Sequence, residues 1–407
     1  MTGRFKLAFC LAICLNAAGL QAQPDAVARY RVAEPHWVGT WGCAPQLTEP
    51  ANLPPAPGLS GNTLRQIVRV TLGGKQLRVR FSNLFGDGPL SVDSAQLAVS
   101  GGGGAIEPGT RKAMKFRGFD SVTIARGDEI VSDTLDYDLP PMTDMAVTIL
   151  FREVPVAVTG HPGSRSTSYL EAGDAVEAVS LTQPAKTAHW YIITGIEVMA
   201  DGASASVAVL GDSITDGRGS TTDGNDRWTD VLARRLYVNE RTATVTVLNE
   251  GLGGNTVLAR GLGPPAVTRF DRDLLGQTAV RWLILLEGVN DIGGNTSPNV
   301  AADLIAAYGQ FIDKTHARGV RVYGVPILPF GRSMYDSPAH EAARQAVNQW
   351  IRTSGRFDAV IDMDSAVRDP ETPSNLLPGY DTGDHLHLNP AGYRKMAEII
   401  DLNLFAF

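Results

Sequence analysis

The stretch VAVLGDSITDG, residues 207–217, decides how the second half of the chain folds. Four apolar residues that end at a glycine predict a buried strand running into a sharp turn. Ser213 then lies at the carboxyl end of that strand, where open α/β sheets bind their ligands. A serine after a strand can equally be a simple turn or N-cap residue. Its role therefore depends on whether the rest of the chain supplies chemical partners for it.

The segments after Ser213 alternate between apolar runs and helical periodicity. Strands are expected at 244–248, 280–286, 320–327 and 359–361, and helices at 227–236, 266–275, 301–317, 339–350 and 391–404. The strands are continuous apolar runs, which is typical of a parallel sheet covered on both faces. Right-handed crossovers then make this half an α/β domain with a doubly wound, five-stranded parallel sheet.

The first half has a different pattern, with short alternating segments separated by glycine, proline and aspartate. Residues 63–72 and 75–82 are two alternating runs on either side of Gly73-Gly74, which predicts a β-hairpin. Further strands are expected at 91–99, 121–125, 145–151 and 190–199. This half is predicted to be an antiparallel β-sandwich of jelly-roll type. Residues 37–41 are expected to form an edge strand, with a crossing to the second domain as an open alternative.

One loop of the first half, HPGSRSTSY at 161–169, combines an imidazole, a guanidinium and several hydroxyl groups. Loops of this composition often carry function. A surface turn held by its own hydrogen bonds is the alternative.

The N-terminus has the three-part pattern of a secretory signal. Arg4 and Lys6 precede an apolar core at 7–15, and small residues lead to Ala22. We expect cleavage near Ala22 and a secreted or periplasmic protein, with an uncleaved anchor as the alternative. The expected divisions are a signal peptide at 1–22, the β-sandwich domain at 23–200 and the α/β domain at 201–407.

Composition narrows the classes of partner. Removing a signal with two basic and no acidic residues changes the formal net charge from −7 to −9, which disfavours nucleic acid and anionic lipid. Cys43 is the single cysteine that remains after removal, so no intrachain disulfide is expected. After the signal, no apolar run approaches the roughly 20 residues of a membrane helix.

Three later loops supply groups that suit a nucleophilic Ser213. Gly254 lies in NEGLGGNT, where closely spaced glycines let the backbone point an N–H at a ligand. Asn290 follows the next strand, and its amide can stabilise an oxyanion without adding charge. Asp384 and His387 are three residues apart in DHLH, so the carboxylate can hold Nδ1 while Nε2 receives the serine proton. His385 is the rival base. Because it is adjacent to Asp384 in the chain, its side chain is expected to point away from that carboxylate, which favours His387 as the base.

These four blocks, GDS, GLGGNT, GVND and DHLH, resemble in order those of the SGNH, or GDSL-type, hydrolase superfamily. The resemblance covers about 207–407 and implies a flavodoxin-like sheet. It implies Ser213 as nucleophile, His387 as base and Asp384 as its orienting carboxylate. The Ser213 and Gly254 N–H groups and the Asn290 side chain would form the oxyanion hole. No metal or cofactor is implied, and the histidines have no zinc-site spacing.

We therefore expect a secreted serine esterase that acts through an acyl-enzyme. Its substrate is expected to be a small-molecule or polysaccharide ester, most simply a short acyl group such as acetyl on carbohydrate. A general arylesterase, a short-chain lipase and an acyltransferase are the enzymatic alternatives. A noncatalytic carbohydrate-binding protein is the alternative from another class.

Overall fold

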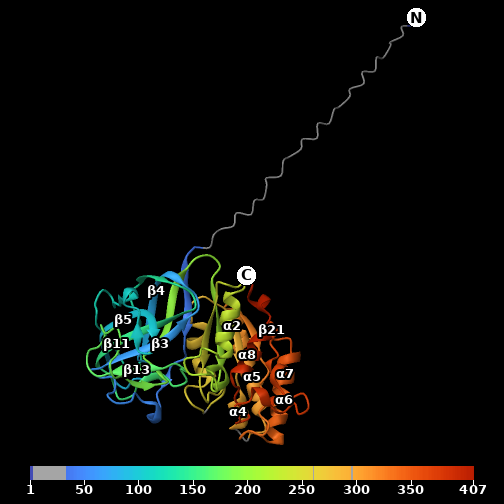
Figure 1. Ribbon diagram of the computed structural model, residues 1–407. Helices are drawn as coiled ribbons and strands as arrows, with labels where there is room; N and C mark the ends of the chain where they lie inside the picture. The colour runs from blue at the N-terminus through green and yellow to red at the C-terminus, as the bar shows by residue number, and fades with distance from the viewer. Residues whose placement is uncertain (3–33, 260, 295–296) are drawn as a thin grey trace.

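The computed structural model describes residues 1–2, 34–259, 261–294 and 297–407. From residue 34 onward, the described chain forms two halves side by side (Figure 1). The first half consists of β-strands, and the second alternates strands and helices. The predicted signal peptide and its cleavage site lie outside the described residues. The last strand of the first half ends at Ala200, and the first strand of the second half begins at Ala205.

Two antiparallel sheets pack face to face in the first half over a core of aliphatic and aromatic side chains. The first sheet has the order β1 (His36–Gly42), β16 (Ile193–Ala200), β4 (Gly74–Ser82) and β10 (Leu135–Leu139), with β9 (Glu129–Val131) also on β4. The second has the order β14 (Ala185–Thr187), β13 (Ser168–Glu171), β3 (Thr63–Val70), β11 (Thr143–Glu153), β5 (Leu90–Gly102) and β6 (Ala105–Ile106), and β7 (Lys112–Ala113) and β8 (Val122–Ile124) also pair with β5. A small third sheet joins β15 (Trp190–Tyr191), β12 (Thr159–His161) and β2 (Gln46–Leu47). The antiparallel prediction is confirmed.

The predicted hairpin at Gly73-Gly74 is wrong. β3 and β4 do not pair with each other, because they belong to opposite sheets and the glycines carry the chain between them. Neither glycine has the positive φ that a two-residue hairpin turn needs. A Cβ on Gly73 would instead overlap the carbonyl oxygen of Leu139, and one on Gly74 would lie 2.7 Å from that of Met199. Glycine is needed at both positions because neighbouring backbone lies too close for a side chain. In the sequence, such a glycine pair looks the same as the glycine pair of a hairpin turn.

The second half has the predicted five-stranded parallel sheet. Its order is β18 (Val245–Gly251), β17 (Ala205–Gly211), β19 (Val280–Leu286), β20 (Arg321–Gly324) and β21 (Ala359–Val360). This order, 2-1-3-4-5 in chain sequence, is that of the flavodoxin-like doubly wound folds. The predicted fold class is confirmed. All five strands run in the same direction, so the loops after them meet at one edge of the sheet.

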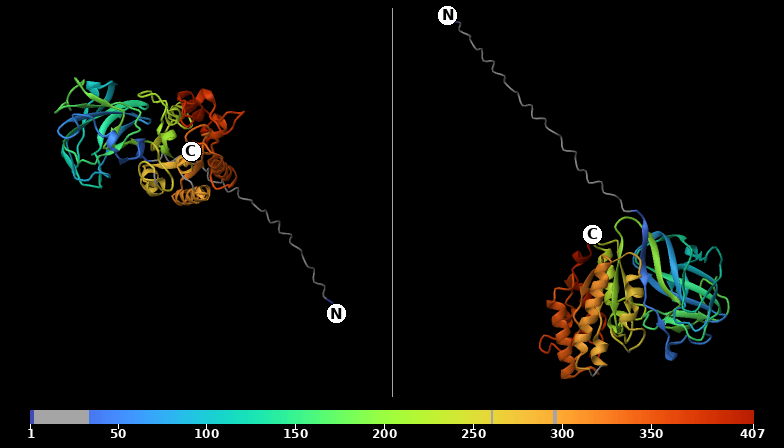
Figure 2. Two further views of the ribbon diagram at one scale, coloured as in Figure 1. Left: turned by 90° about the horizontal axis from the view of Figure 1, so that it is seen from below. Right: turned by 180° about the vertical axis from the view of Figure 1, so that it is seen from behind.

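Helices cover both faces of this sheet (Figures 1 and 2). One face carries α2 (Trp228–Tyr237), α7 (Met363–Val367) and α8 (Pro390–Glu398), and the other carries α4 (Val289–Gly293), α5 (Val300–Ala317) and α6 (Pro338–Thr353). Two shorter helices, α1 (Ser213–Asp216) and α3 (Ala266–Phe270), follow β17 and β18. The helix predicted at 266–275 continues from α3 as a π-helical turn at Asp271–Leu275. In the described residues no helix has the length and apolar character needed to span a membrane.

The predicted edge strand lies against the second half. β1 is the outer strand of its sheet and packs beside β18. The carbonyl oxygen of Gly39 accepts hydrogen bonds from Ser206 Oγ (3.2 Å) and Thr246 Oγ1 (2.6 Å), and its N–H donates to Thr278 O (3.3 Å). A Cβ at Gly39 would lie 2.9 Å from Leu248 Cδ1, so the strand can approach this closely only as glycine. The two halves are thus joined through backbone as well as side chains.

Gly73→Ala should lower the free energy of unfolding by about 1–3 kcal/mol, because the neighbouring backbone cannot yield to a new methyl group. Gly109→Ala is the matched control, since a Cβ there has no neighbour within 4 Å. Urea unfolding of both variants measures the difference. Equal stabilities would show that close backbone approach does not require glycine at position 73.

Candidate active site

Ser213 begins α1 immediately after β17. The Asp212 carboxylate accepts a hydrogen bond from the Ile214 N–H (2.9 Å) and caps the short helix. A Cβ on Gly211 would overlap the Thr215 side chain, so the sharp passage from strand to helix needs glycine at that point. The serine is therefore held at the sheet edge predicted from its sequence.

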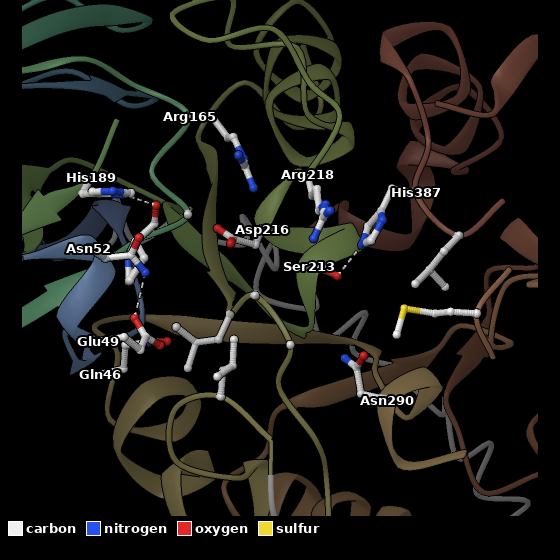
Figure 3. Close-up of a pocket in the computed structure, with 18 of the residues that line it drawn as sticks. Gln46, Glu49, Asn52, Arg165, His189, Ser213, Asp216, Arg218, Asn290 and His387 are labelled. Atoms are coloured by element: carbon white, nitrogen blue, oxygen red, sulfur yellow. Dashed lines mark hydrogen bonds between the residues drawn. The ribbon is translucent and has the colours of Figure 1, made fainter. Parts of the chain in front are cut away.

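A chain of hydrogen bonds links Ser213 to a histidine and an aspartate (Figure 3). Ser213 Oγ is 2.8 Å from His387 Nε2, and His387 Nδ1 is 2.7 Å from Asp384 Oδ2. The other oxygen of Asp384 accepts the His387 backbone N–H at 2.9 Å. His385, the rival base, has its Nδ1 2.5 Å from Asp381 Oδ2 instead. The geometry therefore pairs Ser213 with His387.

The electrostatics of this pair suit proton transfer at neutral pH. Burial lowers the pKa of His387 below its ordinary value, and the positive charges of Arg218 and Arg165 lower it further, although Asp384 opposes them. Burial alone would raise the pKa of Asp384, but the hydrogen bonds from His387 outweigh it and hold that pKa below its usual range. The imidazole is thus neutral and the carboxylate ionised near pH 7.

The predicted oxyanion donors lie in the loops after β18 and β19. Gly254 has a φ of +68°, a conformation that disfavours any side chain. The Asn290 amide is fixed at both ends, because Nδ2 donates to Asn255 O (2.7 Å) and Oδ1 accepts from Tyr335 (3.0 Å). The second hydrogen on Asn290 Nδ2 is left for the pocket. Tyr335 is a positioning residue that no sequence motif marks.

A buried arginine holds these segments together. Arg269 of α3 donates to the carbonyl oxygens of Gly211 (3.2 Å) and Glu250 (2.7 Å) and to Asn255 Oδ1 (2.9 Å). It is 1% exposed, so these bonds form away from water, where unpaired groups would be costly. One guanidinium therefore fixes the ends of β17 and β18 relative to the Gly254 loop. No sequence motif marks Arg269 as part of the site.

Ser213, His387 and Asn290 open onto one pocket of about 410 Å³ (Figure 3). Both halves of the chain line it. The first half contributes Gln46, Glu49, Asn52, Pro162, Gly163, Arg165 and His189. None of these was predicted as a site residue, although three lie in the loop at 161–169 that was singled out for its composition. The first half therefore forms part of the wall of the candidate active site.

The loop at 161–169 is fastened to the second half beside the serine. His161 is buried, with Nδ1 2.9 Å from Ala44 O and Nε2 3.0 Å from Asp216 Oδ1. A side chain on Gly163 would overlap the Asp216 carboxylate, so glycine is needed for this approach. Asp216 is three residues from Ser213. The first half thus contacts the short helix that carries the serine.

The described part of the chain contains no cluster of three or more His, Cys, Asp or Glu side chains arranged to hold a metal ion.

The site residues lie within a segment that matches a known protein family. The model of the GDSL-like lipase/acylhydrolase family matches residues 209–395, which include Ser213, Gly254, Asn290, Asp384 and His387. Residues 209–395 belong to this family. The predicted superfamily and the predicted class of enzyme, an ester hydrolase, are confirmed at this level. The GDSL-like domain corresponds to the α/β half, and the match does not extend to the β-rich half.

Solved structures similar to the chain cover about half of its length. An acetylxylan esterase from Geobacillus stearothermophilus, solved as a catalytic mutant, is 18% identical with a TM-score of 0.39, over 51% of this chain and 96% of that one. A GDSL-like lipase from Bacteroides thetaiotaomicron is 18% identical with a TM-score of 0.36, over 48% and 84%. TesA is 20% identical with a TM-score of 0.38, over 48% and 94%. Comparison with curated protein sequences gives no match.

The structure brings all five predicted site residues of the GDSL-like domain to one pocket or its immediate border. Ser213, His387, Gly254 and Asn290 line it, and Asp384 lies behind the histidine. Their chemical roles stay predictions, which the experiments below address.

The rate should fall with acid through a midpoint below pH 6.5, because protonated His387 cannot accept the Ser213 proton and burial lowers the pKa of the imidazole. The pH profile of kcat/KM on a neutral aryl acetate measures it. His385→Asn should leave the midpoint in place, since that ring pairs with Asp381. A midpoint above 6.5 would contradict the assignment of His387.

Proposed function

We propose that the protein is a secreted or periplasmic serine esterase that removes short acyl groups, acetyl above all, from carbohydrate. The observation that carries the proposal is the hydrogen-bonded chain from Asp384 through His387 to Ser213. It supplies a nucleophile, a base and a group that fixes the tautomer of the base.

In the proposed reaction Ser213 Oγ attacks the ester carbonyl carbon while His387 Nε2 takes its proton. The carbonyl oxygen gains negative charge, which the N–H groups of Ser213 and Gly254 and the Asn290 amide stabilise. The tetrahedral intermediate collapses when His387 gives the proton to the departing alcohol, leaving an acyl-serine. Water, deprotonated by the same imidazole, then attacks the acyl group and releases the acid.

The lining of the pocket supports an ester of a polar alcohol. Its wall from the first half is polar, with Glu49 accepting hydrogen bonds from Gln46 (2.5 Å) and Asn52 (3.0 Å). Such an arrayed amide and carboxylate surface suits hydroxyl groups better than a long hydrocarbon chain.

Ser213→Ala should abolish hydrolysis of 4-nitrophenyl acetate while the thermal unfolding midpoint stays close to that of the parent. A fluorophosphonate probe should label the parent at Ser213 and leave this variant unlabelled. Ser220→Ala is the control, because its hydroxyl only donates to the Gly217 carbonyl in a nearby turn. Hydrolysis by Ser213→Ala at the rate of the parent would contradict the assignment of Ser213 as the nucleophile. An unlabelled, inactive parent would favour the noncatalytic binding protein.

Asn290→Ala should reduce kcat about 10²–10³-fold, the usual loss for one oxyanion donor. The folded state should persist, as circular dichroism would show. Asn299→Ala is a control of the same chemistry, since Asn299 precedes α5 and its side chain makes no capping hydrogen bond. Similar turnover in both variants would exclude the Asn290 amide from oxyanion stabilisation.

Acetylated xylan, acetylated pectin and 4-nitrophenyl esters of two, four and eight carbons should be compared by release of acid. We expect acetyl esters to have the highest kcat/KM and the eight-carbon ester the lowest. The opposite order of chain length would favour the lipase alternative.

A further inference from the structure

The loop at 161–169 holds an arginine in an unusual backbone conformation at the edge of the pocket. Arg165 has a φ of +50°, which non-glycine residues adopt at an energetic cost. The surrounding bonds impose it: the Asp223 N–H donates to Arg165 O (2.9 Å), and the Asp223 carboxylate accepts from Thr167 N–H (2.6 Å) and Oγ1 (2.7 Å). The Arg227 side chain also donates to Ser164 O. These contacts fix the direction of the Arg165 side chain.

That direction is into the pocket. Figure 3 shows Arg165 and Arg218 projecting from the same side toward Asp216 and Ser213, with Arg218 between Arg165 and His387. Both line the pocket, one from each half of the chain. Within the described residues neither guanidinium has a side-chain hydrogen bond or an ion pair, and the Arg165 Nε is buried without a partner. Two unpaired cations beside a nucleophile are unusual in a chain of net charge −7.

Most carboxylate oxygens that line the same pocket are already hydrogen-bonded within the protein. Glu49 accepts from Gln46 and Asn52, and one Asp216 oxygen accepts from His161. The other Asp216 oxygen is buried against Gly163 and has no hydrogen-bond partner among the described residues. The donors of Arg165 and Arg218 are therefore in excess over the acceptors around them.

The arginines lie on the alcohol side of the proposed reaction. His387 must protonate the departing alcohol, so that alcohol lies on the His387 side of Ser213, away from the Asn290 amide that would hold the carbonyl oxygen. Arg218 is beside His387 on this side, with Arg165 beyond it (Figure 3). Their five-donor planar groups match a carboxylate in geometry as well as in charge.

We propose that Arg165 and Arg218 bind a carboxylate on the alcohol part of the substrate, so that the enzyme prefers esters of acidic sugars such as uronic acids. The β-rich half then sets specificity by supplying one of the two cations. This inference rests on the proposed esterase function and names the substrate class of the same site.

The test compares two substrates of nearly the same shape, one with a negatively charged group and one with a neutral group at the same position. An acetylated methyl galacturonoside is used as the free carboxylate and as its neutral carboxamide, and acetate release gives kcat/KM for each. The parent should prefer the carboxylate by roughly tenfold or more, the scale of a charge-assisted hydrogen bond. Added sodium chloride should reduce this ratio through screening. Arg165→Gln and Arg218→Gln should each lower it several-fold, and Arg165→Lys should retain part of it.

Arg117→Gln is the matched control. Arg117 is an exposed arginine of the same half with the same left-handed backbone (φ +55°), and it does not line the pocket. Its loss should leave the ratio unchanged. Arg218 is exposed, so Arg218→Gln tests the site even if Arg165→Gln unfolds.

Equal rates for the two substrates in the parent would overturn the carboxylate site, as would an equal loss of preference in Arg117→Gln and Arg218→Gln. Hydrolysis of 4-nitrophenyl acetate separates this failure from a failure of the proposed function. If the parent hydrolyses that ester but cleaves the carboxylate and carboxamide substrates equally well, the proposed esterase function is supported and the proposed carboxylate site is wrong. If the parent hydrolyses neither 4-nitrophenyl acetate nor either galacturonoside substrate, both the esterase function and the carboxylate site are wrong.

Discussion

The hydrogen bond between Ser213 Oγ and His387 Nε2 joins residues 174 positions apart, and the rest of the candidate site is arranged around it. It can form because parallel strands deliver their carboxyl-terminal loops to one edge of a sheet. The strand order places β17 between β18 and β19, so the loops that carry Gly254 and Asn290 flank the serine. The turn before α8 then brings the histidine across that edge. The site is a consequence of strand direction and order.

The β-rich half is part of the same assembly. β1 contacts β18 through the backbone of Gly39, and His161 holds Asp216, which is one helical turn from the serine. The pocket wall that faces the proposed nucleophile therefore comes from a segment outside the GDSL-like domain. In the proposed function, the domain would supply the groups for ester chemistry, and polar groups of the β-rich half would contact the rest of the substrate.

Sequence reasoning succeeded where a local pattern reports a local constraint. Residues 282–286 are all apolar because that part of β19 is buried on both faces, and the predicted bounds of the strand match the structure. The helix predicted at 391–404 ends at Glu398 instead, and a separate 3-10 helix at Leu402–Phe405 follows after a non-helical break at 399–401. The hairpin at Gly73 failed because alternation is the same whether two strands share a sheet or face each other. Arg165 and Tyr335 were not predicted as site residues, because their positions at the site depend on contacts between segments distant in the chain.

The absence of a side chain at Gly163 has a consequence for how the two halves can be separated. The glycine lies directly on the Asp216 carboxylate, and His161 completes the cover. Cutting the chain at residue 201 would uncover that carboxylate beside Ser213 and admit water to a surface that the intact protein keeps dry. A shortened form made for crystallography or biotechnology would thus inherit the reactive serine with altered solvation around it. Both halves are therefore needed to keep the surroundings of Ser213 as they are in the intact protein.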